Sequence, residues 1–181
     1  GYWNGLMRPQ RRVSRWYKAD RALNGKYRSQ GVCVRLVAPA DGILKGASAL
    51  VTTGDESNER AILKDSVCQH ARLTVSPGRS RRQYPNSPMG AVALARQAMY
   101  DAEWYGRSWA AYESGSGQAR PERNEALEAL RGARAGEQWF MIDAANELYF
   151  LRADRFAREF GLEVVVRGSG NEYRRLEAIQ A

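Results

Sequence analysis

The chain of 181 residues is 44% apolar and carries a formal net charge of +8, with 28 Lys and Arg against 20 Asp and Glu. This length is typical of one domain with a single core, and the apolar content excludes a disordered chain of the low-hydrophobicity class. No segment approaches the roughly 20 uninterrupted apolar residues of a membrane-spanning helix. Two cysteines and one histidine exclude a disulfide framework and a multi-histidine metal centre.

The positive charge is concentrated near the N-terminus. Residues 1–35 contain nine basic residues and one acid, whereas residues 36–181 contain 19 residues of each sign. One hypothesis is that the aromatic residues Trp3, Trp16 and Tyr17 and the surrounding charges bind nucleic acid through stacking and phosphate contacts. We favour the alternative that the segment is a surface that another part of a larger protein neutralises.

In the N-terminal half the pattern predicts short elements separated by glycine and proline. They are a helix over 9–23, a buried strand within 31–39, a loop over 40–48, a strand over 49–53, a turn at 54–58 and further short strands within 60–75. Cys33 lies in the apolar run of the first predicted strand, so we interpret it as a small buried apolar residue.

The C-terminal half alternates more regularly. The prediction is an exposed loop over 77–88, helices over 88–112 and 121–134, a strand over 138–142, a helix closed by Gly161, a strand over 162–166 and a helix over 171–180. Strands and helices that alternate with short links predict parallel strands and right-handed crossovers. This α/β pattern of parallel βα units fits a doubly wound sheet and part of a (β/α)8 barrel equally well.

Ligands of parallel α/β proteins bind at the carboxyl ends of the strands. The polar residues that follow the predicted strands are Asp41, Lys45, Ser48, Asp143, Asn146, Arg167 and Ser169. Ser48, Asn146, Arg167 and Ser169 are the candidate substrate-binding residues.

Simpler structural roles compete with these assignments. Asp143 and Asn146 are residue types that cap helices, and the glycines around Ser169 form either a phosphate cradle or, as we favour, a plain turn. We interpret His70 as structural. With one histidine in the sequence, a complete Ser-His-Asp triad is not expected.

Short segments along nearly the whole chain carry a resemblance to a known family. They are Trp3-Asn4, Arg8-Pro9, Gly31-Val32, 37–39, Gly42-Ile43, 46–51, 84–91, Arg96-Gln97, 101–105, 124–130, 156–162 and 173–176. Together they resemble bacterial imidazolonepropionase-like members of the amidohydrolase superfamily.

This resemblance implies an internal part of a metal-dependent hydrolase barrel. Residues 1–181 would form a single, incomplete TIM-barrel-like domain, with a basic N-terminal segment at 1–30. Enzymes of this kind use divalent cations, Zn or similar, to activate a water that attacks an amide carbonyl. The resemblance places the His-x-His metal ligands outside this chain and puts Asp143 where a histidine is usual. Asp143 is therefore a candidate oxygen ligand for a hard cation.

The resulting functional hypothesis is a parent protein that hydrolyses C–N bonds of a small-molecule amide or cyclic amide. We expect the chain alone to be inactive and to pair with the rest of the barrel. Because an open half-barrel exposes strand edges, a free chain should form homo-oligomers or be marginally stable. The alternative is a catalytically degenerate barrel that binds a small molecule or peptide. The compartment, bacterial periplasm or cytoplasm, stays open.

Overall fold

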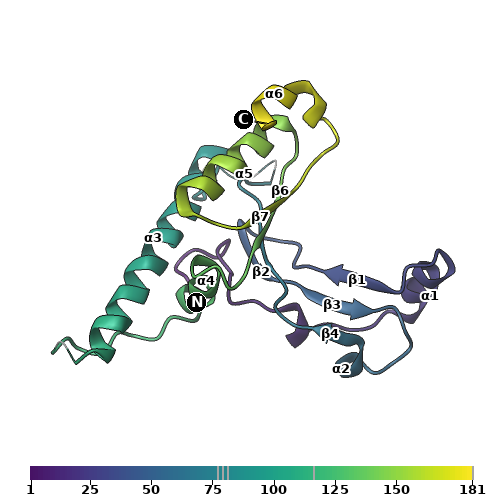
Figure 1. The fold of residues 1–181 in the computed structure, drawn as a ribbon, viewed down its shortest axis with the longest axis horizontal. Helices are drawn as coiled ribbons and strands as arrows, with labels where there is room; N and C mark the ends of the chain where they lie inside the picture. The colour runs from purple at the N-terminus through teal and green to yellow at the C-terminus, as the bar shows by residue number, and fades with distance from the viewer. Residues whose placement is uncertain (77, 79, 81, 116, 181) are drawn as a thin grey trace.

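The computed structural model describes residues 1–76, 78, 80, 82–115 and 117–180, and it contains two separate sheets with helices packed around the larger one (Figure 1). The helices are α1 (Arg21–Ser29), α2 (Asn58–Ala61), α3 (Pro88–Glu113), α4 (Glu125–Arg134), α5 (Glu147–Phe160) and α6 (Leu176–Gln180), with 3-10 turns at Val13–Arg15 and Glu172–Arg175. The strands are β1 (Val34–Val37), β2 (Leu44–Ala47), β3 (Ala49–Thr52), β4 (Ile62–Lys64), β5 (Gln69–Ala71), β6 (Phe140–Asp143) and β7 (Val164–Arg167).

The larger sheet has the strand order β2-β5-β6-β7. β2 and β5 are antiparallel, whereas β5, β6 and β7 are parallel to one another. Helices α3 and α4 connect β5 to β6, and α5 connects β6 to β7. The α/β class and the parallel βα units are thus confirmed. The four described strands of this sheet form an open sheet, so closure into a barrel stays a prediction.

The main core lies between this sheet and helices α3, α4 and α5. The apolar face of α3 repeats every three or four residues, and Ser87 caps the helix by accepting a hydrogen bond from the Gly90 amide. Phe140 and Ile142 point into the core from alternate positions of β6. Gly161 ends α5 in the left-handed conformation, with φ of 60°. The predicted long helix, the following strand and the closing glycine are all confirmed.

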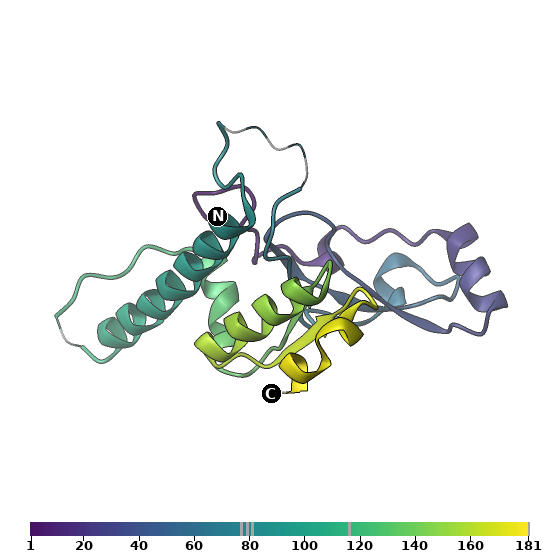
Figure 2. The ribbon, with the colours of Figure 1, turned by 90° about the horizontal axis from the view of Figure 1, so that it is seen from above.

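The smaller sheet, β1-β3-β4, projects with α1 and α2 away from the main core (Figure 2). Its own core consists of Val13, Tyr17, Ala49, Val51 and Ala61. The prediction of a buried first strand is wrong, because β1 is an edge strand that pairs with β3 alone among the described strands and has no fully buried residue.

Cys33, just before this strand, is exposed rather than buried. The helix predicted over 9–23 is also wrong. A 3-10 turn at Val13–Arg15 is followed by α1, which begins after Asp20 because this side chain caps it by accepting from the Leu23 amide. The apolar contacts at Val13 and Tyr17 belong to the small sheet and not to one helical face.

The loop predicted over 40–48 contains strand β2, and Gly46 explains the error. Its φ is +113°, and a Cβ at this position would lie 2.4 Å from the Arg11 carbonyl oxygen. The N-terminal segment runs directly over the strand here, with the Ala47 amide donating to the same carbonyl at 2.8 Å. The glycine therefore permits close backbone approach within a strand.

Three smaller differences concern the later part of the chain. The second helix begins at Glu125 rather than near 121, because Asn124 accepts hydrogen bonds from the Ala126 and Leu127 amides. The final helix is divided into a 3-10 turn and α6. Residues 77, 79 and 81 of the predicted loop lie outside the described residues. In the described part of the chain, none of the helices has both the length and the apolar character needed to cross a membrane.

Candidate functional site

The carboxyl ends of three parallel strands bring charged residues together at one edge of the larger sheet. Arg72 directly follows β5, Asp143 is the last residue of β6, and Arg167 is the last residue of β7. The strand register pairs Asp143 with Arg167 and Ala71 with Ile142. This edge is the place at which parallel α/β folds bind ligands.

Asp143 is surrounded by three cationic side chains. Lys45 Nζ donates to Asp143 Oδ2 at 2.5 Å, and Arg167 Nε forms an ion pair with Asp143 Oδ1 at 2.8 Å. Arg72 Nε lies 4.0 Å from Oδ2. The Lys45 and Asp143 side chains are only 5% and 10% exposed, so this ion pair is largely removed from solvent. One carboxylate cannot neutralise three cations, and the cluster keeps an excess of two positive charges.

His70 lies behind this cluster and is buried. Burial, together with the positive charges of Lys45 and Arg167, lowers its pKa to about 4 against the opposing effect of Asp143. The ring is therefore neutral at pH 7 and adds no charge to the site.

A chain of polar contacts connects His70 to Ser48. Cys68 Sγ lies 3.3 Å from His70 Nε2, and Ser48 Oγ lies 3.2 Å from the same sulfur. Burial raises the pKa of the Cys68 thiol, which keeps it protonated. All three side chains are buried, and none of them lines the cavity at the carboxyl edge.

That cavity has a volume of about 480 Å³. Its polar groups come from Arg72, Thr74, Ser76, Tyr149, Arg167 and Ser169, and Asp143 is its lining acid. The Tyr149 hydroxyl lies 3.4 Å from the Thr74 hydroxyl. This hydrogen bond and the nearby Arg152 lower the pKa of Tyr149. The lining is therefore rich in hydrogen-bond donors and carries net positive charge.

Some of the predicted site residues line this cavity and others do not. Arg167, Ser169 and Asp143 all line the cavity, and Asp143 forms ion pairs with Lys45 and Arg167. Asn146 caps α5, accepting from the Leu148 and Tyr149 amides, and does not line the cavity.

The glycine-rich turn around Ser169 already holds a carboxylate. Glu172 accepts hydrogen bonds from the Ser169 amide at 2.6 Å and the Gly170 amide at 2.8 Å, and these bonds lower its pKa. The amides that a phosphate would need are occupied by Glu172, which agrees with the plain turn that we favoured.

Arg72, Thr74, Ser76 and Tyr149 are the polar cavity residues that sequence reasoning missed. Arg72 follows a three-residue strand whose ends were not predicted, and Tyr149 lies in the first turn of α5. A search of the sequence for polar residues after every short strand would have found Arg72. A search for hydroxyl groups in the first turn of the following helix would have found Tyr149.

The donor set does not fit a divalent metal. Both carboxylate oxygens of Asp143 are paired with cationic side chains, Oδ2 with Lys45 and Oδ1 with Arg167. Among the residues that the structure describes, no group of three or more His, Cys, Asp or Glu could hold a metal ion. The expected Zn-type cofactor would therefore require residues from elsewhere.

Comparison with known proteins supports the fold. No protein-family model matches the chain, and no curated protein matches it significantly. The crystal structure of an amidohydrolase from Thermotoga maritima MSB8 superposes on 86% of this chain with a TM-score of 0.72 and 21% sequence identity. The chain spans 40% of that protein's length. The backbone is thus amidohydrolase-like over most of its described length.

Proposed function

We propose that this chain forms the substrate-binding part of a hydrolase that cleaves C–N bonds of small amides or cyclic amides. The observation that carries the proposal is the position of the cavity. It lies at the carboxyl edge of parallel strands, in a fold shared with a solved amidohydrolase. Enzymes with parallel α/β folds build their substrate sites at this edge.

The charges of the cavity favour an amide that also carries an acidic group. Asp143 holds Arg167 through Nε, which leaves the terminal nitrogens of the guanidinium to contact a ligand. Arg72 lies at the other side of the same carboxylate and is 46% exposed. Tyr149 and Ser169 supply further hydrogen-bond donors. In this arrangement the chain binds and orients the substrate, and Lys45 and Asp143 position the arginines.

Residues outside this chain would then complete the catalytic machinery, including any divalent cation. This division of roles agrees with the expectation that the chain alone does not turn over substrate. It also retains the small-molecule amide and the rest of the barrel as the partners of the chain.

A binding module without catalysis is the second candidate. The observation that favours it is the saturation of Asp143, the acid of the cavity, by Lys45 and Arg167. A carboxylate whose two oxygens are already paired with cationic side chains is not free to contact a substrate or a water molecule.

The test measures binding and turnover separately. Calorimetric titration of the chain with N-acetylglycine and N-acetylglycinamide should show tighter binding of the carboxylate, and Arg167→Ala should weaken it at least tenfold. Arg155→Ala is the matched control, since Arg155 is an exposed arginine outside this cavity. Release of acetate by the parent protein distinguishes the hydrolase from the binding module. Equal affinity for the two compounds would remove the role proposed for the arginines.

A further inference from the structure

A groove lies between α3 and α5, which pack side by side against the larger sheet (Figure 1). We call it the α3–α5 groove. It has a volume of about 480 Å³, which is within the range of small-molecule sites. Arg96 of α3 pairs with Glu159 of α5 at 2.6 Å, and the Tyr100 hydroxyl donates to the same carboxylate at 3.3 Å. These contacts fix the two helices beside the groove.

Most of the lining of the α3–α5 groove is apolar. Met89 and Val92 contribute from α3, and Leu148 and Leu151 contribute from α5. The residues of each pair are three positions apart, so they lie on one face of their helix. Met89 and Leu148 are 81% and 52% exposed. A ligand with an apolar chain would therefore remove apolar surface of both helices from water.

The charged residues that the structure describes in this lining are all arginines. Arg96 is held by Glu159, and Arg152 lies over the Tyr149 ring at 4.3 Å. Arg155 forms no hydrogen bond, ion pair or ring contact with any described residue. Arg96 and Arg155 lie at the same end of the groove, because Glu159 is about one helical turn from Arg155. This end therefore has an arginine that is available to an anion.

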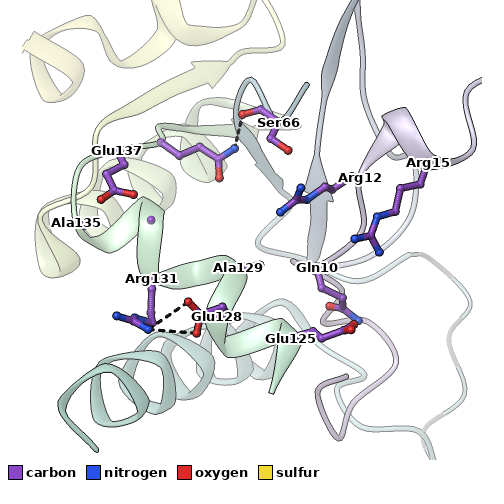
Figure 3. A pocket seen from close by; sticks show the side chains of 12 residues that line it. Gln10, Arg12, Arg15, Ser66, Glu125, Glu128, Ala129, Arg131, Ala135 and Glu137 are labelled. Atoms are coloured by element: carbon purple, nitrogen blue, oxygen red, sulfur yellow. Dashed lines mark hydrogen bonds and ion pairs between the residues drawn. The ribbon is translucent and has the colours of Figure 1, made fainter. Parts of the chain in front are cut away.

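Uniform charge distinguishes this groove from the larger cavity at the amino ends of β5 and β6. That cavity has a volume of about 600 Å³, and its lining mixes acids with arginines (Figure 3). Glu128 pairs with Arg131 there at 3.1 Å. A lining of both signs selects no single ligand charge. A lining of arginines selects an anion, and the guanidinium group matches the geometry of a carboxylate.

The dimensions of the α3–α5 groove favour a small ligand over a protein partner. The lining extends from Met89 to Arg96 on one helix and from Leu148 to Arg155 on the other, which corresponds to about 10 Å along each axis. Nine described residues line the groove, whereas a standard protein interface uses roughly 20–30 residues on each side. A short chain with an anionic head fits this length and this charge.

We propose that the α3–α5 groove binds a medium-chain carboxylate, with its carboxylate at Arg155 and Arg96. Its alkyl chain lies over Val92, Leu148 and Leu151. The site is independent of the hydrolase proposal, because it shares no lining residue with the carboxyl-edge cavity. N-acetylglycine lacks the alkyl chain that this groove requires, so Arg155→Ala stays a valid control for binding at the carboxyl edge.

The experiment is a calorimetric titration of the complete chain with octanoate, butyrate and octylamine. Octanoate should bind at least tenfold more tightly than butyrate, because each buried methylene adds to the affinity. It should also bind at least tenfold more tightly than octylamine, because the arginines repel an ammonium group. Arg155→Gln should weaken octanoate binding at least tenfold, and Arg96→Gln should weaken it less, since Glu159 already holds Arg96. Leu148→Gln should weaken it about fivefold.

Matched variants separate this site from adsorption to a basic, partly apolar surface. Arg21→Gln removes an exposed arginine outside the groove, and Leu63→Gln removes an apolar side chain that is 55% exposed, close to the value for Leu148. Both should leave the affinity for octanoate unchanged. Thermal unfolding of each variant checks that it is folded. The proposal is overturned if octanoate does not bind below about 10 mM, if butyrate or octylamine binds equally well, or if the groove variants behave like the controls.

Discussion

The buried ion pair between Lys45 and Asp143 makes an asymmetric prediction about stability. Asp143→Asn leaves Lys45, which is 5% exposed, together with Arg167 and Arg72, and provides no carboxylate for any of them. Breaking a buried pair in this way costs about 3–5 kcal/mol, because the remaining charge stays buried without compensation. Lys45→Met leaves Asp143 bonded to Arg167 at 2.8 Å, and its apolar side chain fills the same space. We expect a cost of about 1 kcal/mol.

Urea unfolding of both single variants and of the double variant Lys45→Met/Asp143→Asn measures these costs. The double variant should be more stable than Asp143→Asn alone, because the stranded ammonium group is gone. Asp154→Asn breaks an exposed helical pair with Arg158 and is the control, with an expected cost below about 0.5 kcal/mol. Equal losses for the two single variants, or strictly additive losses in the double variant, would refute the charge imbalance argued for this cluster.

Three further predictions concern single residues. The pKa of His70 is lowered to about 4 in the folded protein, so the unfolded state binds more protons below pH 6.5. The free energy of unfolding should therefore fall by up to about 3 kcal/mol between pH 6.5 and pH 4. A His70→Gln variant should lose this part of the pH dependence in urea titrations. Gly46→Ala should lower the free energy of unfolding by about 3 kcal/mol, because its Cβ would meet the Arg11 carbonyl oxygen. Gly25→Ala is the control: a Cβ there meets no atom within 4 Å, so this variant should stabilise α1 slightly. A Gly46→Ala variant as stable as the original chain would contradict the close approach. Asn146→Ala should cost about 1 kcal/mol of unfolding free energy and Asn146→Asp much less, if its function is to cap α5; a large loss of ligand affinity without a loss of stability would instead support a role in binding.

Elements defined by local chemistry could be predicted from the sequence. Ser87 and Pro88 mark the start of α3, and Gly161 marks the end of α5, because capping depends on a few neighbouring residues. β6 and β7 follow from short apolar runs on either side of a helix. Their parallel pairing follows from the length of the connection between them.

Elements defined by distant contacts could not be predicted. Gly46 looks like part of a loop until the segment around Arg11 is known to cross it. Cys33 has apolar neighbours in sequence but is exposed just before an edge strand, and whether a strand lies at an edge is a property of the whole sheet. Periodicity describes which face of an element is apolar, and it contains no information on what covers that face.

The same distinction applies to the candidate site. Arg167 and Ser169 were found because the strand before them is recognisable and its carboxyl end is a known place for ligands. Arg72 joins them only because β5 lies next to β6, although the two strands are separated by two helices in the chain. Lys45 and Asp143 are 98 positions apart, and their pairing depends on the antiparallel position of β2 beside β5.

Net charge by region gave a misleading indication of where positive charge matters. Residues 36–181 are neutral overall, yet Lys45, Arg72 and Arg167 create a local excess of positive charge at the carboxyl edge. The acids that balance the count lie elsewhere in this part of the chain. Several of them are paired with other arginines on the helices, namely Glu103, Glu128, Asp154 and Glu159. In the basic N-terminal segment, by contrast, Arg28 is already paired with Asp55. The positive charge at the carboxyl edge therefore follows from the folding of the neutral part of the chain, and the charged cavity would persist if the N-terminal segment were neutralised.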